Sequence, residues 1–180
     1  MTPRSATVEA IVLKRHNYQE ADRFITVFSR YQGKVEALAK GVRKLSSRKR
    51  PALEPGNHVK LSITTSTHLP LITEAILIHP FTAAKANLPR ITQLHQLLEI
   101  VDLLTVETES HPQVFNLLQQ SLRALETNGH KKDYLLENIR LILQDLGFTY
   151  DKKFSEGGLR RYIEDLGNRN LRSKAFLTVT

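Results

Sequence analysis

The sequence predicts an α+β protein, with a small closed β-sheet in residues 1–80 and an α-helical domain in residues 81–180. Two observations support this division. Five short segments rich in β-branched and alternating apolar residues fall within about 75 residues, and Gly and Pro separate them. After Pro80 the apolar residues recur at intervals of three and four, the period of an amphipathic helix.

The strand segments are short enough to form a compact sheet. We expect them at residues 7–13, 23–29, 35–39, 58–64 and 71–78. Polar residues 16–20 predict a turn after the first segment. In the second, Ile25 and Val27 alternate with Phe24 and Phe28, and we expect both phenylalanines in the core. Gly33 suits a hairpin that needs a positive φ.

Five such strands favour a closed barrel of the oligonucleotide-binding (OB) type over a sandwich. Closure of the sheet is expected to leave no free strand edge. A barrel of this type presents one strand face and its flanking loops to a single nucleic-acid strand.

The second half predicts three helices. Their apolar positions fall within residues 91–101, 114–125 and 135–146. Ser110 is the expected N-cap of the second helix, and Gly147 the expected C-cap of the third. Residues 149–158 predict a loop, and residues 159–166 and 171–177 predict two short helical turns.

The positive charge is concentrated at one end of the chain. The formal net charge is +8, and residues 1–50 hold 12 Lys and Arg against 4 acidic residues, so the remaining 130 residues are neutral overall. This asymmetry indicates an anionic partner, either nucleic acid or an anionic membrane surface. No apolar run is long enough to span a bilayer and the N-terminus lacks a secretory signal, so we expect a cytoplasmic protein with no membrane-spanning segment.

The basic residues cluster most densely in an acid-free stretch, residues 40–50, where six of eleven are Lys or Arg. Flexible cationic side chains there can neutralise phosphates and release their counterions, although a solvated loop or an unstructured tail-like run is the alternative. Tyr18 and Tyr31 could stack bases or pack over the barrel rim. The candidate DNA-binding residues are Lys14, Arg15, Arg23, Arg30, Lys34, Lys40, Arg43, Lys44, Arg48, Lys49 and Arg50.

Nothing in the sequence favours an enzyme. The chain has no Cys, its seven His are scattered singly, and no glycine-rich phosphate loop or nucleophile elbow occurs. We therefore expect no catalytic residue, no metal site and no cofactor.

Four motifs in order and spacing resemble the N-terminal domain of the RecO family of bacterial DNA repair proteins. They are YQEADR at residues 18–23, FSRYQGK at 28–34, LAKGVRK at 38–44 and LEP at 53–55. The helical half agrees more loosely through LGF at 146–148, and LRSKAFL at 171–177 is similar to the last helix of the family.

The resemblance implies an OB barrel followed by a helical domain in a non-enzymatic mediator. Members bind single- and double-stranded DNA, anneal complementary strands, and act with RecR and the single-strand-binding protein SSB so that RecA can load during repair. The family's basic motif falls on Lys40, Arg43 and Lys44. Many relatives carry a Cys-rich, often zinc-binding segment that is missing here, which removes any metal expectation.

The resemblance also implies a site for the acidic C-terminal tail of SSB on the helical domain. Such a site needs an apolar groove beside a cation, and the candidates are Arg123, Lys132 and Arg140. Two readings from other classes stay open: an OB-fold protein that binds RNA, and a non-catalytic assembly module in which the basic stretch is incidental.

Overall fold

The computed structural model describes residues 4–65, 69–127, 132–149, 155–173 and 175–177. They divide into two compact units. One contains residues 1–80 and 106–110, and the other contains residues 81–105 and 111–180. Among the described residues, no helix combines the length and apolar character needed to cross a membrane.

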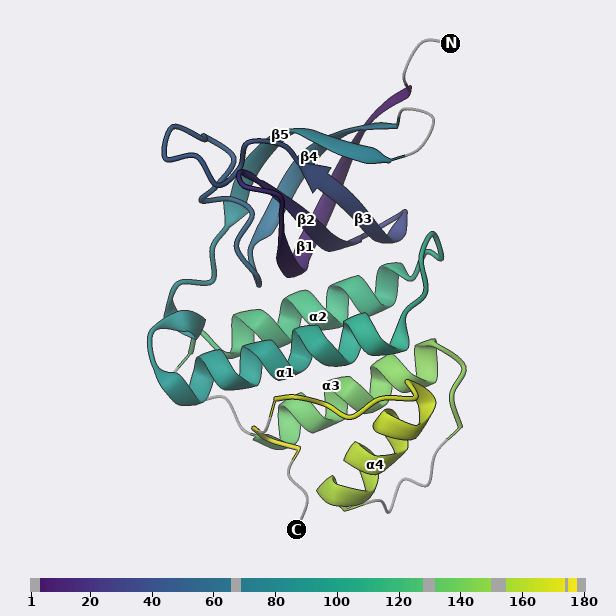
Figure 1. Cartoon of the computed structure of the whole chain (residues 1–180). Helices are drawn as coiled ribbons and strands as arrows, with labels where there is room; N and C mark the ends of the chain where they lie inside the picture. The colour runs from purple at the N-terminus through teal and green to yellow at the C-terminus, as the bar shows by residue number, and fades with distance from the viewer. Residues whose placement is uncertain (1–3, 66–68, 128–131, 150–154, 174, 178–180) are drawn as a thin grey trace. The chain divides into compact units, whose positions relative to one another are not determined.

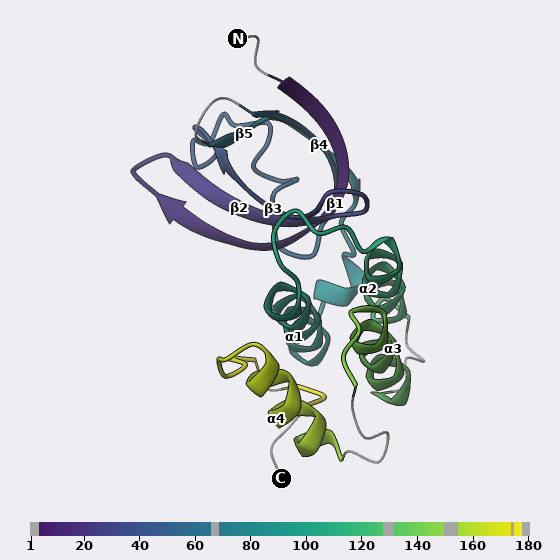
Figure 2. The same ribbon diagram turned by 90° about the vertical axis from the view of Figure 1, so that its right-hand side faces the viewer.

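The first unit is a closed five-stranded barrel, which confirms the predicted OB-like fold (Figures 1 and 2). Its strands are β1 (Arg4–Tyr18), β2 (Asp22–Ser29), β3 (Gly33–Ala39), β4 (His58–Thr65) and β5 (Pro70–His79). They follow one another around the barrel in the order β1-β2-β3-β5-β4. Neighbours are antiparallel except β3 and β5, which are parallel and pair at a single position, Leu38 with Leu71.

The barrel core is built from the inward-facing residues of all five strands and from the connection between β3 and β4. Ile25 and Val27 of β2 are fully buried there, as the alternation predicts. Val42, Ala52 and Leu53 come from the connection and are buried in the same cluster. Residues 40–57 therefore close one end of the barrel with apolar side chains.

The first strand is longer than expected. Residues 16–18 were predicted to lie in a turn, but they continue β1 and pair with Asp22–Phe24 of β2. A register shift between Val12 and Lys14 marks a bulge, which bends the strand as a long strand in a small barrel requires. The turn is reduced to residues 19–21.

The placement of Phe24 in the core was wrong. Phe28 is fully buried, but Phe24 is only partly buried and lies on the face of β2 opposite Ile25 and Val27. Its ring stacks on His16 at a centroid distance of 5.0 Å and meets the edge of Tyr18 at 4.8 Å. Each partner is on β1, directly opposite or diagonal to Phe24 in the register.

Gly33 confirms the expected positive φ, at 68°. A second reason for glycine is that residues 106–110 run against this turn. A Cβ at position 33 would lie 1.9 Å from the carbonyl oxygen of Glu109. The main chain of Thr108 donates to the carbonyl of Lys34 at 3.1 Å, which fixes the approach.

The second unit consists of a short 3-10 helix η1 (Ala83–Lys85) and four α-helices, α1 (Leu88–Leu104), α2 (Pro112–Ala124), α3 (Lys132–Asp145) and α4 (Glu156–Leu166). The predicted N-cap Ser110 is wrong, because His111 occupies the cap of α2 without a side-chain hydrogen bond. Gly147 follows α3 with a φ of 79°, as the predicted cap requires.

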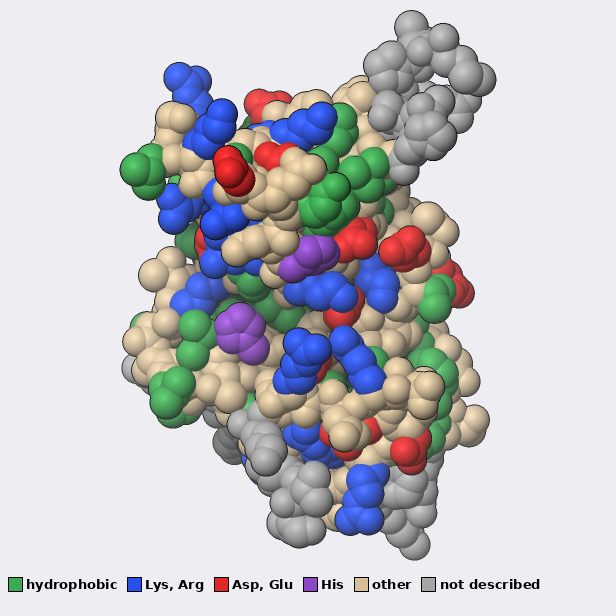
Figure 3. Space-filling model, viewed as in Figure 1, with side chains coloured by type: hydrophobic (Ala, Val, Ile, Leu, Met, Phe, Trp, Pro, Cys, Tyr) green, Lys and Arg blue, Asp and Glu red, His purple; other side chains and the backbone are tan. Residues whose placement is uncertain are grey.

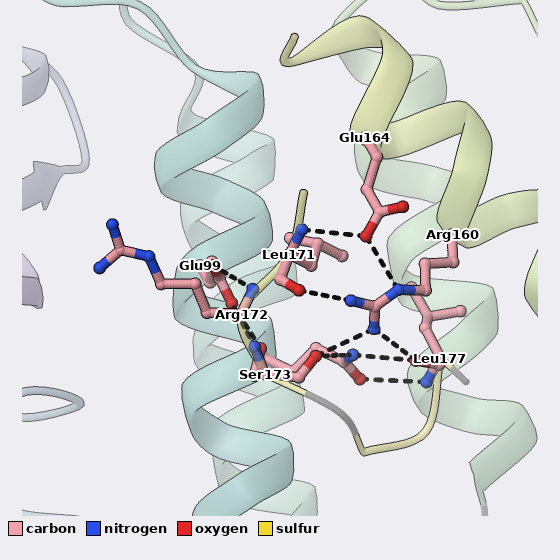
Figure 4. A network of polar contacts seen from close by, with 8 residues as sticks. Glu99, Arg160, Glu164, Leu171, Arg172, Ser173 and Leu177 are labelled. Carbon is pink, nitrogen blue, oxygen red and sulfur yellow. Dashed lines mark hydrogen bonds and ion pairs between the residues drawn. The ribbon is translucent and has the colours of Figure 1, made fainter. Parts of the chain in front are cut away.

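The predicted helical turn at residues 171–177 is also wrong. The described part of this segment is irregular and lies along α1 and α4 (Figure 4). Arg160, which is 3% exposed, donates to the main-chain carbonyls of Leu171, Ser173 and Leu177. Gln96 of α1 donates to two of these carbonyls and accepts from the Leu177 amide. Main-chain groups that a helix would pair internally are thus satisfied by side chains.

Candidate nucleic-acid interface

The connection between β3 and β4 is an ordered loop with a buried inner side and a cationic outer side. We call residues 40–50 the cationic loop. Val42 anchors its first half in the barrel core, and Ala52 and Leu53 anchor the chain immediately after it. These anchors show that the stretch is not the unstructured run considered above.

Hydrogen bonds at both ends hold the loop against the rest of the barrel. The Gly41 amide donates to the carboxylate of Asp22 at 2.8 Å, and the Arg43 amide donates to the Ala21 carbonyl at 2.9 Å. At the other end, the Gly56 amide donates to the carbonyl of Val12 at 2.8 Å. The loop is thereby fixed to β1 and to the turn between β1 and β2.

Most of the loop's cations point into solvent. Lys40, Arg43, Lys44 and Arg48 are exposed. Arg43 donates to the carbonyl of Gln19 at 3.0 Å, and no acidic side chain in the described part of the chain pairs with the other three. Lys and Arg side chains gather on this part of the barrel unit in the space-filling view (Figure 3, upper left).

Lys49 differs from its neighbours because it is partly buried and attached. Its Nζ donates to the carbonyl of Ile72 on β5 at 3.0 Å. The pKa of Lys49 is lowered by burial, and the charge of Asp22 partly opposes the shift. The side chain therefore fastens the loop to β5, and it is less available to a ligand than Lys44 or Arg48.

A second group of cations lies beside the loop, where β1 and β2 meet. Arg15 forms an ion pair with Glu54, and Nη1 of Arg23 lies 3.8 Å from the same carboxylate. The pKa of Arg23 is lowered first by burial and then by repulsion from Arg15, Arg50 and Arg43, while Glu54 raises it. Three neighbouring guanidinium groups thus repel that of Arg23, and Glu54 attracts it.

One buried hydrogen-bond donor among these cations also has no acceptor. Nη1 of Arg23 is buried and makes no hydrogen bond to any described residue. The Glu54 carboxylate lies 3.8 Å from it, beyond hydrogen-bond distance, so the charge of this nitrogen is only partly compensated.

The rings of His16, Tyr18 and Phe24, which we call the aromatic ledge, lie beside these cations. The Arg23 guanidinium donates to Asn17, between two ledge residues, and Tyr18 is 40% exposed. An exposed ring next to a group of cations is an arrangement suited to stacking a nucleic-acid base. Sequence reasoning missed Phe24 and His16 here; the alternation that buries Ile25 and Val27 is the signal that places Phe24 on the outer face.

The structure does not bring all the predicted cations together. Lys14 is exposed on β1, near the loop end of the barrel. Arg30 follows β2 and Lys34 lies on β3 opposite Phe28, so they are seven and five residues from Arg23 along the strands, roughly 23 Å and 17 Å. Arg30 forms an ion pair with Glu9 at 3.2 Å, so its charge is partly compensated.

Tyr31 lies in the turn between β2 and β3 and is 73% exposed. It is therefore not packed over the barrel rim, and it lies near Arg30 and Lys34 rather than near the cationic loop.

The three cations predicted to contact the C-terminal tail of SSB lie on two helices. Arg123 is exposed near the end of α2. Lys132 forms an ion pair with Glu156, and Arg140 forms one with Glu137 at 3.5 Å. Their role as tail contacts stays a prediction. In the described residues, no group of three or more His, Asp or Glu side chains could hold a metal ion.

Comparison with known proteins assigns the family. The family model "Recombination protein O N terminal" matches residues 1–81, and "Recombination protein O C terminal" matches residues 86–150. The chain belongs to the RecO family. The chain is 38% identical over 135 residues to the DNA repair protein RecO of Nocardioides sp., covering 74% of this chain and 55% of the relative. It is 43% identical over 120 residues to RecO of Frankia casuarinae, covering 65% and 49%.

A third RecO relative matches over a longer stretch of the chain. The chain is 32% identical over 149 residues to RecO of Roseiflexus sp., which covers 82% of this chain and 52% of the relative. The chain thus spans about half the length of the curated RecO relatives it matches. The predicted family resemblance is confirmed.

Proposed function

We propose that the chain is a non-enzymatic mediator of DNA repair that binds single- and double-stranded DNA and anneals complementary strands. The observation that carries this proposal is the excess of guanidinium and ammonium groups at the loop end of the barrel, on a main chain already anchored in the core. Membership of the RecO family, whose relatives are named DNA repair proteins, supports the choice of DNA as the polyanion.

Annealing of this kind needs no bond chemistry. Two complementary strands repel each other through their phosphates, and cations that neutralise phosphates on both strands lower this repulsion. Lys40, Lys44 and Arg48 have long flexible side chains and no acidic partner in the described residues, so they can contact phosphates at little cost. Bases not held in a specific pocket remain free to pair.

The test is a DNA-binding titration over a range of salt concentrations, combined with a strand-annealing assay. About four exposed loop cations contacting phosphates should give a slope of log affinity against log salt of about −3 for single strands. The variant Lys40→Ala/Arg43→Ala/Lys44→Ala should reduce the slope to about −1 and slow annealing. An unchanged slope would remove the loop from the DNA-binding site.

A matched control keeps the net charge of that variant. Lys60, Arg161 and Arg172 are exposed and lie outside the cationic loop. Replacing these three with Ala should leave binding close to that of the parent chain. Competition between DNA and RNA strands of the same sequence tests the alternative that RNA is the ligand, because an RNA-specific site would discriminate through the 2′-hydroxyl.

We further propose, from the family resemblance, that the chain acts with RecR and the SSB C-terminal tail in the RecA pathway, in the cytoplasm at the nucleoid. Arg123, Lys132 and Arg140 remain the proposed tail contacts. Arg123 is the most accessible of them, because the other two are engaged with Glu156 and Glu137. Loss of tail-peptide binding in Arg123→Ala, with DNA binding unchanged, is the expected result.

A further inference from the structure

The aromatic ledge is a compact cluster on the outer face of the sheet where β1 and β2 pair. His16 and Phe24 are direct cross-strand partners, and their rings stack at a centroid distance of 5.0 Å. Tyr18 meets the same Phe24 ring edge-on at 4.8 Å. Phe24 is partly buried, whereas the side chain of His16 is 55% exposed and Tyr18 is 40% exposed. Two aromatic rings that reach solvent are therefore held in place by a third.

The turn that follows the ledge joins it to the cationic loop. Gln19, the residue after Tyr18, has a positive φ of 49°, and its carbonyl accepts from the Arg43 side chain at 3.0 Å. The carbonyl of Ala21, in the same turn, accepts from the Arg43 amide at 2.9 Å. Because these contacts exist in the unbound chain, stacking a ligand on the ledge requires little further ordering of the protein.

The charges around the ledge favour a base over a phosphate as the group that contacts the rings. Glu36 on β3 has a carboxylate oxygen 3.9 Å from Nδ1 of His16, and a carboxylate repels a phosphate. The Arg43 guanidinium lies against the carbonyl of Gln19, one residue along the chain from Tyr18. A strand whose phosphates follow the loop cations can thus bring a base to the rings. Every base has a π-face, so the stacking accepts any of them.

We propose that the aromatic ledge stacks one unpaired base and thereby makes the chain bind a single strand more tightly than the duplex that annealing produces. In a duplex each base is already stacked and paired, and its extrusion costs free energy. Pairing of the two strands therefore withdraws the base from the ledge, while the phosphates stay in contact with the cations. The inference rests on the proposed DNA binding and names the part of the ligand that the rings contact.

The consequence for annealing is release of the product. A duplex carries a higher density of phosphate charge than a single strand, so a surface that acted through cations alone would retain the duplex. Stacking of a base on an aromatic side chain contributes about 5- to 150-fold in affinity. One stacked base is enough to favour the single strand, and the ledge thus distinguishes the substrate of annealing from its product.

Strands with and without bases separate stacking from phosphate contact. An abasic oligonucleotide has the phosphates of its base-bearing counterpart but no rings to stack. The parent chain should bind a base-bearing single strand at least about fivefold more tightly than an abasic strand of the same length. The variant His16→Ala/Tyr18→Ala should lose most of this preference, while its slope of log affinity against log salt stays at about −3. Equal affinity of the parent chain for the two strands would overturn the proposal.

Two further variants separate stacking from a structural effect of the substitutions. Tyr18→Phe keeps the ring and should keep the preference for the base-bearing strand. Tyr31→Ala removes a ring that is 73% exposed in the turn between β2 and β3, and it should also leave the preference unchanged. Loss of the preference in either variant would contradict stacking at the ledge. Circular dichroism spectra of all variants should match that of the parent chain.

The duplex measures product release directly. Added duplex of the same sequence should inhibit annealing by His16→Ala/Tyr18→Ala at a lower concentration than it inhibits annealing by the parent chain. Failure of this inference is distinguishable from failure of the proposed function. A parent chain that binds base-bearing, abasic and duplex DNA equally, with a slope of about −3, would remove only the role of the ledge, whereas a chain that binds none of them would overturn both.

Discussion

The C-terminal segment should depend on one buried side chain, Arg160. Its Nη1 donates to the carbonyls of Ser173 and Leu177, each at 2.9 Å, and Nη2 donates to the carbonyl of Leu171. Its Nε lies 2.9 Å from the carboxylate of Glu164, one turn along α4. The side chain is 4% exposed and that of Glu164 is 14% exposed, so little solvent replaces a lost contact.

Replacing Arg160 with Met keeps the apolar part of the side chain and removes the guanidinium. The change leaves the Glu164 carboxylate without its ion pair, leaves the Leu171 carbonyl without its side-chain donor, and leaves the carbonyls of Ser173 and Leu177 with Gln96 alone. Hydrogen bonds to charged groups contribute about 1.5–3 kcal/mol each, and breaking a buried ion pair costs about 3–5 kcal/mol. Because these contributions share one group, we expect the free energy of unfolding to fall by about 3–5 kcal/mol, not by their sum.

The assay is equilibrium urea unfolding of the full chain, followed by circular dichroism at 222 nm, with amide hydrogen exchange of residues 171–177 as the local readout. Exchange in this segment should increase strongly in Arg160→Met. The neighbouring Arg161 is exposed, so Arg161→Met should change stability by less than about 0.5 kcal/mol. A loss below about 1 kcal/mol in Arg160→Met, with protection unchanged, would refute the reasoning.

Two further predictions concern backbone geometry and pH. Gly33→Ala should lower the free energy of unfolding by about 2 kcal/mol or more, because the left-handed φ costs about 1–2 kcal/mol and the new Cβ collides with the carbonyl of Glu109. Gly41→Ala, with a similar φ but open space, should cost only the backbone part when both are measured by urea unfolding. Burial raises the pKa of Glu99, but hydrogen bonds from the Ser173 hydroxyl and the Arg172 and Ser173 amides outweigh it, so the pKa is lowered. The stabilisation from Glu99 is therefore complete above the unfolded-state pKa of about 4 and lost as pH falls below it, and Glu99→Gln should reduce the acid dependence of unfolding between about pH 5 and 2. An identical pH profile in Glu99→Gln would contradict this assignment.

The barrel was predictable from the sequence because its elements are determined locally. Alternating apolar residues in β2 and β4 define which face is buried, and Gly33 marks a turn that requires positive φ. The family could also be recognised from the sequence, because its motifs lie in the turns and at the strand ends of this barrel. The cationic loop was identified from composition alone, because six cations in eleven residues with no acid is unusual in a folded domain.

The features that sequence reasoning missed depend on contacts between distant residues. The segment at residues 171–177 has apolar residues at a helical spacing, but Arg160 and Gln96 satisfy its main chain in an irregular conformation. Phe24 is apolar and lies in a strand, yet its neighbours across the sheet, His16 and Tyr18, complete a partly exposed cluster instead of a core. No local pattern in the sequence contains these pairings.

The anchoring of the cationic loop bears directly on how it would bind DNA. A disordered basic segment must lose main-chain entropy when it binds, at about 1–2 kcal/mol for each residue that becomes fixed. Here Val42 and Leu53 are fully buried on either side of the exposed cations, so most of that ordering has already occurred during folding. Binding then costs mainly the side-chain entropy of residues such as Lys44 and Arg48.

Leu53→Ala separates the anchoring from the charge, because it leaves every cation in place. The cavity it creates should destabilise the barrel by about 2–5 kcal/mol and loosen the loop. If prior anchoring matters for affinity, single-strand binding should weaken in this variant while the slope against log salt stays near −3. If the slope falls as well as the affinity, fewer cations reach the phosphates. The core would then determine the position of the loop and not its rigidity.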